Sequence, residues 1–548
     1  MQTQTLLSNW AARLFSAAAL ALVPSAHADN SAARYHFAGA ADLSRKPNYS
    51  VATNLFGLPT SRDFKGLALD RFAGFLAEGL PSQGTAPEDS IAPLLDDWLS
   101  AESVGAFGGT AGGPLQFVLA LRLDNARAKA WDDAIAAACG HHGEGVAASG
   151  AKGLRWGKGA KALWILHHGN WTLLGRGADL DSVRDEYLAG IGGSGRPVAA
   201  MDSNCLEADV DWERLHQWLP ISFGALKLAR TQIELAAGTN RIFHMTAKAT
   251  YPQAISWQSQ PWKIPYNLVS DPLISFTAMQ DISAFLNEDV FAGLPVDPFT
   301  QQFYCWAMGE MVFQSYAALP VADATNAMRE LGATMPAMLN PKLTNLNASV
   351  LHWYPTRNQL SWTSPRLQVV APDMKPARSQ GQPFLLASMF PLQGKTNAPK
   401  ELFAQFKDRS DIVYYDWEVT GPRLQQWRLL GEMLPVVPTV TGDNKPKEQF
   451  YAISATNAAG VKRRVPSFVV SDNWLAGIAP YLGEFTTTEV DKTGPNELTI
   501  KRRSPFLLTA VEWDLLTHWM ARVPSVGRIN PRLLPPAAKM TGPGIPSH

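Results

Sequence analysis

Paired apolar strands joined by glycine-containing turns constrain the fold of this chain more than any other feature. Residues 161–175 hold two apolar runs on either side of Gly169-Asn170, a turn pair that accepts positive φ angles. A second hairpin pattern spans 227–250, with its turn at 238–240. Strands that follow one another in sequence across short turns pair antiparallel. We therefore expect a largely antiparallel sheet.

Acidic residues precede several predicted helices. A carboxylate at this position accepts hydrogen bonds from the free amides of the first turn and lies at the positive end of the helix dipole. We predict this capping role for Asp124, Asp179, Asp181 and Asp211. Another helix is expected to start at Ser504-Pro505, because proline is well tolerated at the first helical position. Helices mixed with antiparallel strands indicate an α+β fold.

The order of a strand, a helix and three strands recurs along the chain. The sequence RLHQW at 214–218 returns as RLQQW at 423–427, after a strand in both cases. A true internal duplication and a chance match both remain open. We expect two α+β lobes of mostly antiparallel sheet with covering helices, a connector between them and a flexible proline-rich tail: 29–260, 261–278, 279–525 and 526–548.

Residues 1–28 have the pattern of a secretory signal peptide. Arg13 precedes ten apolar residues at 14–23, and residues 26–28 (Ala-His-Ala) give a small-x-small cleavage site. Ten apolar residues are too few to span a bilayer, which takes about 20. The sequence therefore predicts a periplasmic or secreted protein with no transmembrane segment after signal removal.

The charge balance argues against a nucleic-acid partner. The formal net charge is +0 at pH 7, whereas binding to phosphates requires a basic surface. Short basic clusters occur at 462–464 and 501–503, each beside an apolar run, and we interpret them as solvated strand ends.

Three cysteines, Cys139, Cys205 and Cys305, allow at most one intramolecular disulfide. Whether such a bond forms is left open by the sequence. No pair has the spacing of a redox or zinc motif, so the fold is expected to depend on packing.

Motifs for cofactors and nucleophiles are weak. GIGGSG at 190–195 matches a dinucleotide-binding pattern, but it follows a predicted helix and leads into a strand, the reverse of the required order. We interpret it as a flexible connector. No GxSxG nucleophile elbow occurs in the chain. We predict no cofactor and leave open whether the chain is an enzyme.

Histidines form the most suggestive polar clusters. His141, His142 and Glu144 would offer imidazole and carboxylate ligands to zinc or copper, although solvated loop residues explain the cluster equally simply. His167 and His168 are adjacent on a predicted strand, where neighbouring side chains point to opposite faces. These two rings are therefore not expected to bind the same ion.

Eighteen tryptophans make aromatic surfaces a second kind of candidate site. Trp353, Trp362 and Trp417 lie in predicted strands with polar neighbours, so we predict an exposed platform for sugar rings or other apolar ligand faces. The alternative for each is core packing, which is the usual role of buried aromatic rings.

One stretch resembles a known group of proteins. The sequences WKIPYNL at 262–268 and DPLISFTA at 271–278 resemble a segment of large, uncharacterised exported bacterial proteins with no assigned activity. The resemblance implies export. It supplies no catalytic or binding residues.

Two functional hypotheses follow. The first is an exported envelope protein that binds a ligand or partner, or acts as a scaffold, without catalysis. The second is a secreted or periplasmic hydrolase whose site is assembled from distant residues. A pocket that joins His141 or His167 with carboxylates would favour the hydrolase, and a groove lined by Trp353, Trp362 or Trp417 would favour binding.

Overall fold

The computed structural model describes most of the chain. Its described residues are 31–77, 87–201, 203–218, 226–238, 240–257, 259–287, 296, 301–309, 314–345, 350–363, 372–389, 400–433, 451–456 and 462–520. The predicted signal peptide, the predicted tail at 526–548 and an expected strand at 366–370 lie outside them. Within the described part, no helix has both the length and the apolarity needed to cross a membrane.

Helices are interspersed among runs of strands in the described part of the chain. The strands are β1 (Ser31–Phe37), β2 (Ser103–Gly108), β3 (Gln116–Arg122), β4 (Glu144–Ala148), β5 (Ala151–Trp156), β6 (Leu163–His168), β7 (Trp171–Arg176), β8 (Leu206–Asp211), β9 (Arg230–Ala237), β10 (Phe243–Thr250), β11 (Leu273–Gln280), β12 (Gln302–Met308), β13 (Ser315–Pro320), β14 (Val350–Tyr354), β15 (Gln359–Thr363), β16 (Asp373–Ser379), β17 (Gln382–Ser388), β18 (Ile412–Val419), β19 (Tyr451–Thr456), β20 (Lys462–Pro466), β21 (Phe485–Gly494) and β22 (Glu497–Ser504). The α-helices are α2 (Ala40–Leu43), α3 (Ser50–Phe56), α4 (Pro59–Ala77), α5 (Pro87–Ser100), α6 (Asn125–Cys139), α7 (Asp181–Ser194), α8 (Trp212–Leu215), α9 (Ala324–Asn345), α10 (Lys400–Ala404), α11 (Thr420–Met433), α12 (Ser467–Ile478) and α13 (Ala510–Met520). Short 3-10 helices are η1 (Pro47–Tyr49), η2 (Gly159–Lys161), η3 (His216–Trp218), η4 (Ile282–Phe285), η5 (Pro355–Arg357) and η6 (Ala479–Tyr481).

Within the described residues, twenty strands form one antiparallel sheet, and β19 and β20 form a separate pair. The pairings give the order β4-β5-β6-β7-β3-β2-β1-β8-β9-β10-β22-β21-β18-β11-β12-β13-β17-β16-β15-β14. The α+β class and the antiparallel pairing predicted from the sequence are confirmed.

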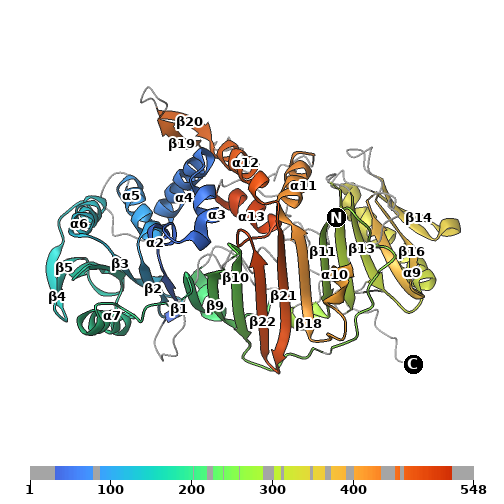
Figure 1. The fold of residues 1–548 in the computed structure, drawn as a ribbon, viewed down its shortest axis with the longest axis horizontal. Helices are drawn as coiled ribbons and strands as arrows, with labels where there is room; N and C mark the ends of the chain where they lie inside the picture. The colour runs from blue at the N-terminus through green and yellow to red at the C-terminus, as the bar shows by residue number, and fades with distance from the viewer. Residues whose placement is uncertain are drawn as a thin grey trace, which may run out of the picture.

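The expected division into two lobes, each with its own sheet, is replaced by one continuous sheet. β10 and β22 pair along their full lengths, from Phe243 opposite Ser504 to Thr250 opposite Glu497, so two separate sheets do not form. Figure 1 shows this junction near the middle of the molecule, with first-half strands to one side and second-half strands to the other. Residues 273–278, which the sequence analysis placed in the connector, form most of β11, between β12 and β18.

The strand register defines two faces of the sheet, because directly paired residues project to the same side. We call one the covered face; its middle row contains Tyr35, Ala208, Ile233, Ala247, Ile500, Val490, Tyr414 and Met279. We call the opposite side of β9, β10, β22, β21 and β18 the open face; its residues are exposed mainly on β9, β10 and β22, while on β18 Tyr415 is buried and Trp417 is half-buried.

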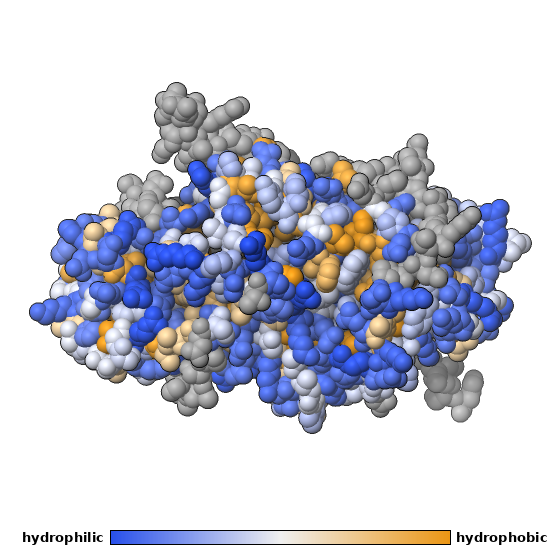
Figure 2. Space-filling view, in the orientation of Figure 1, coloured by the Kyte–Doolittle hydropathy of each residue, from blue (hydrophilic) through white to orange (hydrophobic). Residues whose placement is uncertain are grey.

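Helices pack on the covered face along the whole sheet. α6 packs on first-half strands through Trp131 and Ile135, and α9 packs on second-half strands through Met328 and Leu331. Over the middle, α3, α4, α11, α12 and α13 share one apolar cluster, and Figure 1 shows these helices above the central strands. Figure 2 shows apolar side chains over the middle of the same view and mostly hydrophilic ones towards its ends.

The two hairpins predicted from glycine turns are confirmed. β6 and β7 flank Gly169, whose φ is 59°, and β9 pairs with β10 across the predicted turn. The expected helix at Ser504-Pro505 is wrong, because Ser504 ends β22 and the helix begins at Ala510. The glycine motif at 190–195 is also not a connector, since it completes α7 and Gly195 caps that helix with φ of 77°.

The predicted helix caps are confirmed in part. Asp124 and Asp211 accept hydrogen bonds from the amides of Arg127 and Arg214, at 2.8 and 3.1 Å. α7 has no side-chain cap, so the amide hydrogen bonds predicted for Asp179 and Asp181 are wrong, although Asp181 does lie in the first turn of the helix, at the positive end of its dipole. Asp179 instead accepts hydrogen bonds from the amide and the hydroxyl of Thr110, at 2.9 and 2.6 Å. It thereby holds the glycine-rich β2–β3 loop.

Helix caps provide a test of this architecture. Asp323 accepts amide hydrogen bonds at the start of α9, as Asp124 does in α6. We expect Asp124→Ala and Asp323→Ala each to lower the free energy of unfolding by about 1 kcal/mol, measured by urea denaturation. Asp133→Ala, at an exposed position inside α6, is the control and should leave the midpoint nearly unchanged. An equal response of all three variants would contradict the assigned caps.

Candidate functional site

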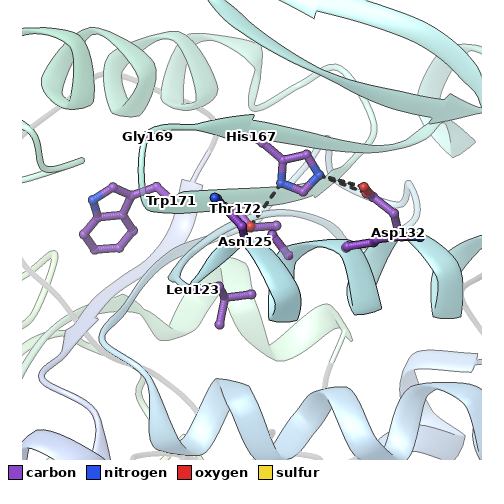
Figure 3. Close-up of a pocket in the computed structure, with 9 residues that line it drawn as sticks. Leu123, Asn125, Asp132, His167, Gly169, Trp171 and Thr172 are labelled. Carbon is purple, nitrogen blue, oxygen red and sulfur yellow. Dashed lines mark hydrogen bonds and ion pairs between the residues drawn. The ribbon is translucent and has the colours of Figure 1, made fainter.

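A cavity of about 210 Å³ lies between α6 and the β6–β7 hairpin. Its lining residues are Leu123, Asn125, Ala128, Lys129, Asp132, His167, Gly169, Trp171 and Thr172. Figure 3 shows the ring of His167 between Asp132 and Thr172. The cavity has room for water or a small polar ligand.

His167 joins a carboxylate and a hydroxyl in this cavity. Its Nε2 lies 2.9 and 3.1 Å from the two oxygens of Asp132, and its Nδ1 lies 3.1 Å from Oγ1 of Thr172. The β6–β7 register places His167 directly opposite Thr172, and α6 brings Asp132 to the other side of the ring. A carboxylate, an imidazole and a hydroxyl in this order are the parts of a nucleophilic relay.

The exposed fractions of these three side chains determine which of them can contact a ligand. Thr172 is only 1% exposed, whereas the side chains of His167 and Asp132 are 28% and 26% exposed. The imidazole and the carboxylate are therefore accessible to a ligand or to an attacking water, and the threonine hydroxyl chiefly orients the ring. The sequence analysis noted His167 but missed Asp132 and Thr172, because the three come together only through the hairpin register and the packing of α6.

The other histidine candidates do not converge. His168 lies on the opposite face from His167, beside Gly192 of α7, as strand alternation predicts. The Nδ1 atom of His141 lies 3.0 Å from the carbonyl oxygen of Cys139, while His142 and Glu144 are exposed. Within the described residues, no group of three histidine, cysteine, aspartate or glutamate side chains is arranged to hold a metal ion.

The three cysteines are free thiols. Cys139 and Cys205 are buried, and Cys305 is half-buried in β12. Packing, not a disulfide, therefore holds these segments.

The three candidate tryptophans occupy two different surfaces. Trp353 and Trp362 lie half-buried in β14 and β15, packed against the cluster beneath α9 on the covered face. Trp353 lies so close to Gly332 of α9 that a Cβ at this glycine would be 2.2 Å from the indole. Trp417 lies on the open face, so the three rings do not form one groove.

Trp417 belongs to an aromatic and cationic patch. Its ring centroid lies 6.3 Å from that of Phe485, with the two planes 28° apart, and Phe485 is 43% exposed. The guanidinium carbon of Arg503 lies 5.7 Å from the Phe485 centroid. The register aligns His244, Arg503, Thr487 and Trp417 across β10, β22, β21 and β18. We call these residues, with Phe485, the open-face patch.

The same strands carry a buried charged network on the covered face. Arg502 donates two hydrogen bonds to Glu512 of α13, at 2.7 and 3.1 Å, and one to Thr488, at 2.9 Å. Both charged side chains are at most 3% exposed. Glu512 also accepts a hydrogen bond from the Thr509 amide, at 2.8 Å, which completes a capping box at the start of α13.

Two further carboxyl groups lie in this network. Asp416 accepts a hydrogen bond from the Thr277 hydroxyl, at 2.6 Å, and Glu418 accepts one from the Ala510 amide, at 2.7 Å. Asp416 lies near the guanidinium groups of Arg502 and Arg423, and Glu418 lies near that of Arg423. Burial disfavours the charged forms of both carboxyl groups and raises their pKa values.

The pKa values of the two carboxyl groups on β18 are both raised. Burial, reinforced by the charge of Asp416, raises the pKa of Glu418 to about 8. Burial raises the pKa of Asp416 to about 6, opposed by its bond to Thr277 and by Arg502. Because the two carboxyl groups interact, the raised pKa values belong to the pair, which holds a proton to a higher pH than free carboxyl groups do.

The sequence analysis found this network only indirectly. The cluster 501–503 was interpreted as a solvated strand end, which fits the exposed Lys501 and Arg503 but is wrong for the buried Arg502. Its partners were not predicted, because α13 was expected to start several residues too early. The available signal was the alternation of charged and aromatic residues in DIVYYDWEV, residues 411–419.

Comparison with family models, curated proteins and solved structures finds no match to this chain. The site must therefore be interpreted from its own geometry.

The charged network predicts how stability depends on pH. The pKa of Glu418 rises on folding from its ordinary value of about 4.3, so the folded state binds the proton more tightly and its stability falls as the pH rises towards 8. Glu418→Gln has no such proton to lose. We expect the free energy of unfolding of this variant, relative to the wild type, to increase between pH 5 and 9 in urea titrations. Glu144→Gln, at an exposed site, is the control, and parallel curves for wild type and Glu418→Gln would rule out the assignment.

Proposed function

We propose that this chain is an exported envelope protein that binds a ligand or partner, without chemical conversion, through its open face. The observation that carries this proposal is the open-face patch, where the ring of Phe485 and the guanidinium group of Arg503 are exposed beside the half-buried ring of Trp417. Aromatic rings and arginine are enriched in binding sites because they combine apolar area with directional polar contacts.

The exposure of the surrounding strands supports this role. Residues on this side of the middle strands are exposed, namely Arg230, Gln232, Glu234, His244, Thr246, Lys248, Thr250, Lys501 and Arg503. Towards one side α7 packs on the same face, and towards the other Trp417 packs at the edge of the cluster that contains α10. A broad polar surface with aromatic rings at its boundary would suit a chain-like or extended partner.

Export remains a prediction of the sequence. It is supported by the apolar leader at 14–23, by the small-residue pattern at 26–28 and by the resemblance of 262–278 to exported bacterial proteins. A periplasmic or secreted location follows from the same observations.

We also propose that the two halves arose by duplication. From β1 to β10 and from β11 to β22, corresponding strands occupy mirrored places in the sheet order, with α6, α7 and α8 matched by α9, α10 and α11. The RLxQW segments have matching contacts in support of this proposal. Gln217 accepts a hydrogen bond from the amide of Gly112 after β2, and Gln426 donates one to the carbonyl of Gly309 after β12, at 3.0 and 2.9 Å.

A secreted or periplasmic hydrolase is the second candidate function, favoured by one observation. His167 lines a cavity and contacts Asp132, so this pair would act as a general base on a bound water. The buried hydroxyl of Thr172 is poorly placed for direct attack on a substrate.

The binding proposal predicts retention on envelope material. We expect the purified chain to co-sediment with isolated cell-wall sacculi, and Trp417→Ala with Phe485→Ser to lower the bound fraction about 3- to 10-fold through lost aromatic contacts. Tyr354→Ser is the matched control, because Tyr354 is 42% exposed on β14 at the far end of the sheet. Binding that is absent, or equal in all variants, would remove the support for this function.

The hydrolase hypothesis predicts that substrate turnover depends on His167. If the cavity is catalytic, His167→Ala should lower turnover of a panel of ester, amide and glycoside substrates by about 100-fold or more. His168→Ala, on the opposite side of the strand, should retain the wild-type rate. The absence of turnover by the wild type, or equal rates in both variants, would eliminate the hydrolase.

A further inference from the structure

The cations of the open face differ in whether a carboxylate neutralises them. Nζ of Lys501 lies 2.8 Å from Oδ2 of Asp491, and Nζ of Lys248 lies 2.7 Å from Oε2 of Glu497. Nη2 of Arg230 lies 2.6 Å from Oδ2 of Asp209. Arg503 is exposed on the same face, and no carboxylate among the described residues lies within ion-pair distance of it. Its guanidinium group contacts the ring of Phe485 instead.

This difference defines a positive site beside an aromatic platform. An arginine fork pairs with a planar carboxylate through two parallel hydrogen bonds, and contact with an aromatic face orients the guanidinium without using its donors. His244 lies directly across the strand pair from Arg503, and Thr487 lies on its other side. The site therefore offers hydrogen-bond donors for an anionic group next to apolar rings.

The four aligned residues of the open-face patch, from His244 to Trp417, form a long row across the sheet. From His244 to Trp417 it crosses three strand-to-strand steps, about 14 Å at a spacing of about 4.8 Å. A ligand that follows this row meets a cation near one end, a hydroxyl in the middle and aromatic rings at the other. A chain of sugar rings matches this order, because its C–H faces pack on aromatic rings and its hydroxyl groups bond to threonine.

We infer that the open-face patch binds a glycan strand that carries carboxylate groups, with a carboxylate on Arg503 and a sugar ring against Trp417 and Phe485. This inference rests on the proposed binding function and names its ligand class. The paired cations on either side leave Arg503 as the cation available to the ligand within the described part of the face.

The test compares one sugar chain with and without its charge. We expect a galacturonic acid oligomer to bind the purified chain about ten-fold more tightly than the same oligomer with methyl-esterified carboxyl groups, measured by titration calorimetry. Added salt should weaken only the acidic oligomer. Arg503→Gln should remove this preference, while Lys248→Gln, which alters a cation already paired with Glu497, should retain it.

The outcomes separate the ligand class from the binding function. Equal binding of both oligomers that is lost in Trp417→Ala would overturn the carboxylate inference but leave the binding function standing. A charge preference that persists in Arg503→Gln would also overturn it, because another cation would then be responsible. Failure of both oligomers to bind would overturn the inference as well, and the sacculus experiment would then decide the binding function alone.

Discussion

The pairing of β10 with β22 is the interaction on which the rest of the structure depends. These strands lie about halfway along the chain and near its end, and their ladder from Phe243–Ser504 to Thr250–Glu497 joins two ten-strand sections. Each section ends its own meander at this point, so without the ladder the sheet would have two unpaired edges in its middle. Unpaired edges are sites of aggregation in β proteins. The ladder removes them and aligns the two halves in one register.

That register determines which charged and aromatic side chains lie on each face of the sheet. On β22, Arg502 turns towards α13 and Arg503 towards solvent; on β18, Asp416 and Glu418 are buried while Trp417 lies on the open face. The buried network fixes α13 through Arg502 and Glu512, and a bidentate pair constrains the geometry more than apolar contact alone. The open-face patch therefore lies on strands whose other side is rigidly held, which favours a pre-organised binding surface.

Local sequence signals predicted part of this arrangement. Glycine turns and alternating residues are sufficient for the hairpins around Gly169 and Gly238, and an aspartate before an apolar stripe marked the start of α6. The junction between β10 and β22 has no local signal, because it joins residues more than 240 positions apart. The same limit applies to the sites. Trp417 was recognised by its polar neighbours, but Phe485 and Arg503 join it only through the register, and the burial of Arg502 depends on where α13 begins.

Side chains of β22 point alternately to the two faces of the sheet, and this limits where the chain tolerates an inserted residue. Insertions in loops are usually absorbed, but a single extra residue inside a strand of this central ladder would exchange the two sides of everything that follows in it. Arg503 would then face the helices and Arg502 the solvent, so the partner of Glu512 and the cation of the surface would be lost together. We therefore expect changes in length to be tolerated outside the ladder, and substitutions on its exposed side to alter recognition without disturbing the buried side.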